Sequence, residues 1–175
     1  MLHLLSLGYK GPTEFGLSTS VNCPSTGVLF NAACGMEITT TLQNVPCEDV
    51  QAEMAARIAG QYGSWHDPHN NGTYSVQNYG GTFSTSRLTG DKKYTDKQIF
   101  TLTTGADGTG CKIEACSRSQ VASYLDGGTN YCDLKMLFCG TQDGCKPLKH
   151  DFTVSTEQTK AHQGSTVDLS ACLKI

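Results

Sequence analysis

The chain has 175 residues, of which 17% are charged, and its formal net charge at pH 7 is −3. A weakly acidic chain without a basic stripe does not suit nucleic-acid binding, and a hydrophobic content of 38% argues against a disordered chain. No apolar run has the length of a membrane-spanning helix. The length predicts one domain over residues 1–175.

The first half of the chain carries mainly strand patterns. Residues 36–42 place Met36, Ile38, Thr40 and Leu42 on one side, and alternation with period two predicts a strand. Further strands are predicted over residues 73–76, 82–88, 97–103 and 111–115, the second and third joined by an exposed polar hairpin, 89–95.

A helix is predicted over residues 48–59, after Pro46. Glu53 and Arg57 are four residues apart, which predicts an ion pair on the outer face of the helix. The opposite face carries the apolar residues of the predicted buried stripe, Val50, Met54 and Ile58.

The second half of the chain shows weaker patterns. Ser117 followed by Gln120 is typical of a capping box and predicts a second, short helix over residues 117–126. Alternating apolar residues predict a strand, namely Cys132, Leu134, Met136 and Phe138. The segment that follows is predicted to be coil attached through Cys172. These elements predict an α+β fold: an antiparallel meander sheet with one main helix on a face, a second short helix, and disulfide cross-links.

Nine cysteines are spread over most of the chain, and no two are separated by only two residues. This spacing favours disulfides over a zinc site and therefore predicts a secreted, extracellular protein, although no segment of this chain has the features of a signal peptide. Eight of the nine should pair, in an order that the sequence does not determine. The odd cysteine is a buried thiol, the link of a covalent dimer, or a cysteine whose partner is not in this chain. A non-covalent dimer is a further alternative. The nine are Cys23, Cys34, Cys47, Cys111, Cys116, Cys132, Cys139, Cys145 and Cys172.

The segment 65–74 concentrates residues typical of a functional site. His66, Asp67 and His69, together with the distant His150, have the donor types that bind zinc or copper. The alternative interpretation is structural, because Asp-Pro and Asn-Gly pairs form turns.

The same loop also predicts surface features. Asn71 begins the only N-x-S/T sequence and is the predicted glycosylation site. Tyr62, Trp65 and Tyr74 are aromatic residues of the type that dominates contact surfaces.

No nucleophile, phosphate-binding or paired-carboxylate motif is recognisable. The sequence therefore favours a non-catalytic extracellular binding or structural domain without a cofactor, with a protein or glycan as partner, and leaves enzymatic activity open. The alternative is a secreted metal-binding protein or metal-dependent enzyme that uses the histidine loop.

Overall fold

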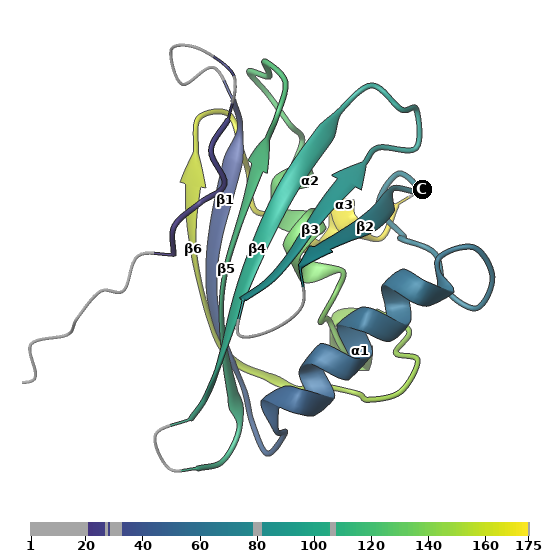
Figure 1. The fold of residues 1–175 in the computed structure, drawn as a ribbon, viewed down its shortest axis with the longest axis vertical. Helices are drawn as coiled ribbons and strands as arrows, with labels where there is room; N and C mark the ends of the chain where they lie inside the picture. The colour runs from purple at the N-terminus through teal and green to yellow at the C-terminus, as the bar shows by residue number, and fades with distance from the viewer. Residues whose placement is uncertain (1–20, 27, 29–32, 79–81, 106–107, 175) are drawn as a thin grey trace, which may run out of the picture.

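The computed structural model describes residues 21–26, 28, 33–78, 82–105 and 108–174. Six antiparallel strands form one twisted sheet with the order β2-β3-β4-β5-β1-β6 (Figure 1). The strands are β1 Gly35–Leu42, β2 Thr73–Asn78, β3 Thr82–Leu88, β4 Thr95–Thr104, β5 Cys111–Ser119 and β6 Val154–His162. The chain thus builds a meander from β2 to β5 and places the first strand between β5 and β6.

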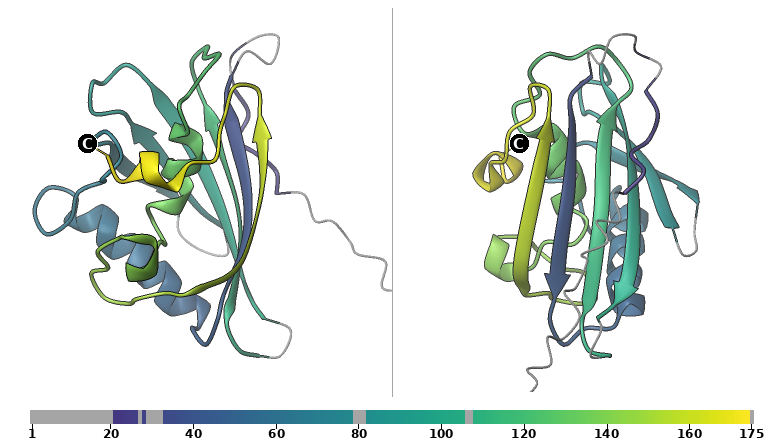
Figure 2. Two further views of the ribbon diagram at one scale, coloured as in Figure 1. Left: turned by 180° about the vertical axis from the view of Figure 1, so that it is seen from behind. Right: turned by 90° about the vertical axis from the view of Figure 1, so that its left-hand side faces the viewer.

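Three α-helices lie on one face of this sheet, as the two views of Figure 2 show. They are α1 Cys47–Gly60, α2 Thr129–Lys135 and α3 Leu169–Cys172. An antiparallel sheet with helices and four disulfides is the α+β class that the sequence predicts. The described residues contain three α-helices where the sequence predicts two.

The hydrophobic core lies between the sheet and these helices. The predicted stripe of α1 is buried, with Val50 and Met54 at 0% exposure. Side chains on alternate positions of the strands meet it, because successive residues of a strand point to opposite faces. The largest of these are Met36, Ile38, Leu42, Phe83, Phe100 and Ile113.

The ion pair of α1 is present, but its predicted exposure is wrong. The Arg57 Nε atom lies 2.8 Å from Glu53 Oε1, and both side chains are fully buried. The reason is that the segment 136–150 covers this side of the helix: Arg57 donates to the Met136 carbonyl, and the Glu53 carboxylate accepts from the backbone of Lys149. Buried charges of this kind need such partners.

Two predictions for the second half of the chain are wrong. Residues 117–119 end β5, and Ser117 is a buried strand residue that donates to Asp133. The strand predicted from Cys132 to Phe138 is instead helix α2 and the turn after it. The apparent alternation misleads because Asp133 and Lys135 are buried as well, each held by oppositely charged partners.

The predicted C-terminal coil is also wrong. It contains strand β6 and helix α3. Strand β6 pairs with β1 along its whole length, yet most of its side chains are exposed or half-buried. An edge strand of this kind shows no apolar alternation in its sequence, which explains why the pattern was not detectable.

Four disulfides cross-link the fold, as the cysteine count predicts. They are Cys23–Cys116, Cys47–Cys111, Cys132–Cys172 and Cys139–Cys145. The odd cysteine is Cys34, which is fully buried. Its Sγ atom lies 3.3 Å from the Ser123 carbonyl oxygen. The structure therefore favours the buried-thiol alternative, because a covalent dimer through Cys34 would require local unfolding.

Candidate functional site

The loop between α1 and β2, residues 61–72, does not present its aromatic residues together. Tyr62 is 83% exposed, whereas Trp65 and Tyr74 are only 6% and 2% exposed. The Trp65 and Tyr74 rings are core residues, with centroids 6.3 Å apart. The predicted contact surface is thus reduced to Tyr62, because the other two rings are covered by the fold.

The predicted metal ligands of the loop are engaged in other contacts. The Asp67 carboxylate accepts from Arg87 Nε at 2.6 Å. The His69 Nδ1 atom donates to the Ala171 carbonyl at 3.1 Å, and its Nε2 lies 3.1 Å from Thr129 Oγ1. Burial lowers the pKa of His69, so its ring is neutral and serves to connect the loop with α2 and α3.

The two remaining predicted ligands lie apart from these. His66 is exposed, and the His150 Nδ1 atom lies 3.8 Å from the Asp49 carboxylate. Over the described part of the chain, one group of three donor side chains lies within metal-binding range, namely Cys23, Glu37 and His162. Cys23 is in a disulfide. The structure does not bring the four predicted ligands together.

The predicted glycosylation site is accessible. Asn71 is exposed and its φ angle is 53°, in the left-handed region. The glycine that follows is required by packing: a Cβ atom on Gly72 would lie 2.2 Å from Arg87 Cζ. The Asn-Gly pair thus serves the turn and allows the close approach of Arg87.

Arg87 is the centre of a buried polar network beneath this loop. Its side chain, on β3, has no exposed surface, and its Nη1 atom lies 3.2 Å from Asp133 Oδ1. On the opposite side it binds Asp67, and its Nη2 atom donates to Asn70 Oδ1 at 2.9 Å. A single guanidinium therefore joins α2, β3 and the loop.

The network contains more carboxyl groups than this one cation can neutralise. Asp96, on β4, is 1% exposed and is hydrogen-bonded to Asp133. A hydrogen bond between two carboxyl groups needs a proton on one of them. Burial raises the pKa of Asp96 and of Asp133. The Asp96–Asp133 pair therefore holds a proton within the fold.

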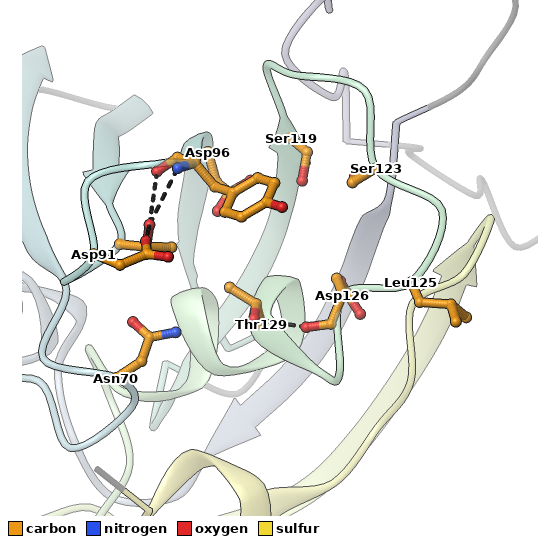
Figure 3. Close-up of a pocket in the computed structure, with 10 residues that line it drawn as sticks. Asn70, Asp91, Asp96, Ser119, Ser123, Leu125, Asp126 and Thr129 are labelled. Carbon is orange, nitrogen blue, oxygen red and sulfur yellow. Dashed lines mark hydrogen bonds between the residues drawn. The ribbon is translucent and has the colours of Figure 1, made fainter.

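Asp96 also forms the buried side of a surface pocket of about 500 Å³, here called the acidic pocket (Figure 3). Its Oδ1 atom is buried, and no N–H or hydroxyl group of the described residues donates to it, although buried polar atoms usually have such a donor. None of the described residues that line the pocket is a lysine, an arginine or a histidine. The lining residues are Asn70, Thr89, Asp91, Tyr94, Asp96, Ser119, Ser123, Leu125, Asp126 and Thr129.

Apolar and aromatic side chains are exposed at this pocket. Tyr94 is 44% exposed and Leu125 is 85% exposed, and both line it. Tyr124, which precedes Leu125, is 70% exposed. Exposed rings beside a polar cavity are typical of contact surfaces, because they offer apolar area at a low cost in conformational entropy.

The walls of the acidic pocket are fixed by local hydrogen bonds. Asp126 accepts from the backbone amides of Gly128 and Asn130 at the start of α2, while the Thr129 hydroxyl donates back to the Asp126 carbonyl (Figure 3). On the opposite side, Asp91 accepts from Thr89 Oγ1 and stabilises the β3–β4 hairpin. Asp91 and Asp126 are thus oriented before any ligand binds.

A second, smaller pocket of about 230 Å³ lies beside the Cys139–Cys145 disulfide and is here called the disulfide pocket. Arg57, Lys146 and His66 line it, and the described part of its lining includes no carboxylate. Trp65 also lines it. The loop 61–72 therefore contributes to both pockets, Asn70 to one and the Trp65–His66 pair to the other.

Sequence reasoning missed Asp96, Tyr94 and Asp126. The hairpin 89–95 was predicted to be a solvent-exposed tip, and three of its residues line the acidic pocket. One signal was present: Asp96 and Phe100 occupy the same face of β4 at period two, and Phe100 is a core residue. That register places a carboxyl group on the buried face of the sheet.

Comparison of the chain with protein-family models, with curated proteins and with solved structures finds no match. Among the described residues, no helix combines the length and apolar character needed to cross a membrane. Any functional assignment therefore depends on the geometry of the two pockets.

Proposed function

We propose that this protein is a secreted, non-catalytic binding protein and that the acidic pocket receives a glycan. The observation that carries the proposal is the buried Asp96 Oδ1 atom, to which no N–H or hydroxyl group of the described residues donates, at a pocket of about 500 Å³. A buried acceptor without a donor costs free energy in the free protein, and a ligand hydroxyl or ammonium group would supply that donor. Four disulfides support an extracellular location.

The lining of the pocket favours a particular kind of sugar. The described residues that line it include three aspartates and no cation, so an acidic sugar would meet like charges. Hydroxyl and amide groups, such as those of Ser119 and Asn70, suit a neutral polyol, and Tyr94 offers a ring against its apolar face. We therefore expect neutral or amino sugars to bind and acidic sugars not to bind.

The glycosylation site is part of this proposal. Asn71 is adjacent to Asn70, which lines the acidic pocket. We propose that Asn71 carries a glycan in the secreted protein, close to the edge of the pocket. A decrease in intact mass after enzymatic deglycosylation, absent in Asn71→Gln, is the expected result.

The metal-binding alternative has less support. Asp67 and His69 are occupied by Arg87, Ala171 and Thr129. A zinc or copper ion bound by all four predicted ligands, including His66 and His150, would need Asp67 and His69 to leave these partners. We therefore propose no metal cofactor.

A glycan array with neutral, amino and acidic oligosaccharides tests the proposed function. We expect binding to neutral or amino sugars that weakens at least about tenfold in Asp96→Asn, because the amide places an N–H donor where the carboxyl group has an acceptor, and an unsatisfied buried group costs about 1–3 kcal/mol. Asp49→Asn is the matched control: it is the same substitution on α1 and outside the pocket, and we expect unchanged binding. Equal binding by both variants, or a preference for acidic sugars, would contradict the proposal.

A further inference from the structure

The Cys139–Cys145 disulfide differs from the other three in its surroundings. Cys139 is buried at 1% exposure, while Cys145 is half-buried and lines the disulfide pocket. The bridge spans only 6 residues, against 40, 64 and 93 for the others. A short loop gives the least stabilisation through restriction of the unfolded chain, so opening this bridge disturbs the fold least.

Arg57 contacts the buried sulfur of this bridge directly. Its Nη1 atom lies 3.3 Å from Cys139 Sγ, and its Nη2 atom donates to the Cys139 carbonyl at 2.7 Å. The guanidinium is charged at all relevant pH values. The Glu53 carboxylate also accepts from the backbone amides of the 148–150 segment, so its charge is shared among several donors.

We propose that the Cys139–Cys145 disulfide is a thiol–disulfide exchange site for small anionic thiols such as glutathione. Arg57 and Lys146 line the disulfide pocket, with His66 beside them, and no carboxylate is among its described lining residues. A thiol that carries carboxylate groups is attracted to such a pocket. The proposal is independent of the acidic pocket and its ligand.

The exchange proceeds in two balanced steps. The thiolate of the small thiol attacks Cys145 Sγ, which is the more accessible sulfur; a new S–S bond forms there, and the Cys139–Cys145 bond breaks. The electron pair leaves with Cys139 Sγ as a thiolate beside the Arg57 guanidinium. A second small thiolate then attacks the small-molecule sulfur of the mixed disulfide. This step releases the oxidised small-molecule disulfide and a Cys145 thiolate. Two thiols are thus oxidised as one protein disulfide is reduced.

The position of Arg57 explains the direction of attack. Exchange is faster when the leaving sulfur is stabilised as a thiolate, and a neighbouring arginine stabilises the thiolate form. Without a cation, a thiolate at the buried Cys139 position would be costly. Attack at Cys145 therefore has both better access and the better leaving group.

The wild-type protein can be tested in glutathione redox buffers, with alkylation and peptide mass spectrometry to identify each open disulfide. Cys47–Cys111 is the matched control, because it also joins a half-buried cysteine to a fully buried one. We expect Cys139–Cys145 to open in a less reducing buffer than the control, with glutathione attached to Cys145. Simultaneous opening of both bridges, or glutathione attached to Cys139, would overturn the proposal.

Two single variants test the role of Arg57 through thiol ionisation. Cys145→Ser leaves the Cys139 thiol beside Arg57, and Cys139→Ser leaves the Cys145 thiol. By ultraviolet titration, we expect the Cys139 thiol to ionise at least about one pH unit below the Cys145 thiol. Equal or reversed values would contradict the proposal. If either variant fails to fold, the wild-type experiment decides.

Charge complementarity is tested with a cationic thiol. Glutathione should open the bridge faster than cysteamine, each rate being corrected for the thiolate fraction. Lys146→Ala should reduce that preference about threefold, as expected for the loss of one exposed charge. A preference for cysteamine would overturn the assignment to anionic thiols.

Discussion

The acidic pocket and the disulfide pocket share one loop but have opposite charge. Aspartates line the first, over a buried network centred on Arg87. Cations line the second, beside a buried pair centred on Arg57. In both cases a fully buried arginine binds a neighbouring segment. Arg87 binds the loop 61–72, and Arg57 binds the turn after α2. We infer that charge buried beneath each surface, and not only charge on it, contributes to what each pocket can bind.

The strongest test of this comparison is removal of the Arg87 charge. Arg87→Met keeps much of the volume but leaves Asp67 and Asp133 buried without their cation. We expect a loss of about 3–5 kcal/mol in the free energy of unfolding, measured by denaturant titration at pH 7. Lys93→Met, at an exposed ion pair of the hairpin, is the control and should leave stability unchanged. A similar small effect in both variants would show that the Arg87 network does not support the acidic pocket.

Removal of single disulfides distinguishes the disulfide pocket from the rest of the fold. Replacing both cysteines of the 93-residue bridge by serine should cost about 4–5 kcal/mol, and replacing both cysteines of the 6-residue bridge should cost about 2 kcal/mol. Thermal or denaturant unfolding of the two double variants measures the difference. Equal losses would mean that the Cys139–Cys145 bridge has a structural role as large as the others.

Acid should destabilise the region around the disulfide pocket. Burial opposes ionisation of Glu53, but hydrogen bonds from the Leu148 amide and Arg57 outweigh it and lower its pKa. The folded protein therefore binds this proton less readily than the unfolded chain, and the stability that Glu53 provides is lost as the pH falls below about 4.3. Glu53→Gln should lose about 2 kcal/mol at pH 7 and show a smaller further loss in acid. Parallel pH profiles for the variant and the wild type would refute this account of Glu53.

Asp96 should show the opposite dependence on pH. Burial raises its pKa, so the folded protein retains a proton that the unfolded chain has released, and stability falls as the pH rises above about 3.9 toward the raised value. Asp96→Asn removes this penalty and should be more stable than the wild type at pH 7, while its glycan binding is weakened. Denaturant titrations at pH 4 and pH 7 measure the change. A destabilised Asp96→Asn at pH 7 would show that the carboxylate supports the fold and is not reserved for a ligand.

The sequence predicted strands β1 to β5, α1 and the number of disulfides because these depend on local patterns. Val50 and Met54 recur at helical spacing, and β1 and β3 alternate with period two. It failed where burial depends on distant partners. Asp133 and Lys135 are polar residues, and their burial depends on oppositely charged partners that include Arg87 and Glu157, far away in the chain.

The candidate site was missed for the same reason. The sequence draws attention to the histidines and aromatics of residues 62–74, which the fold uses mainly as internal contacts. The pocket residues come from segments that are separate in the chain, such as Asn70, Tyr94 and Asp126. No local spacing connects them, and only the order of the strands and the start of α2 bring them together.

The most direct test of the central claim is a backbone-amide NMR titration of the wild-type protein with the strongest ligand from the glycan array. We predict that the largest shifts occur at Tyr94, Asp96, Ser119 and the 123–126 segment, which surround the acidic pocket. Shifts confined to Tyr62 or to the disulfide pocket would contradict the claim, as would the absence of saturable shifts.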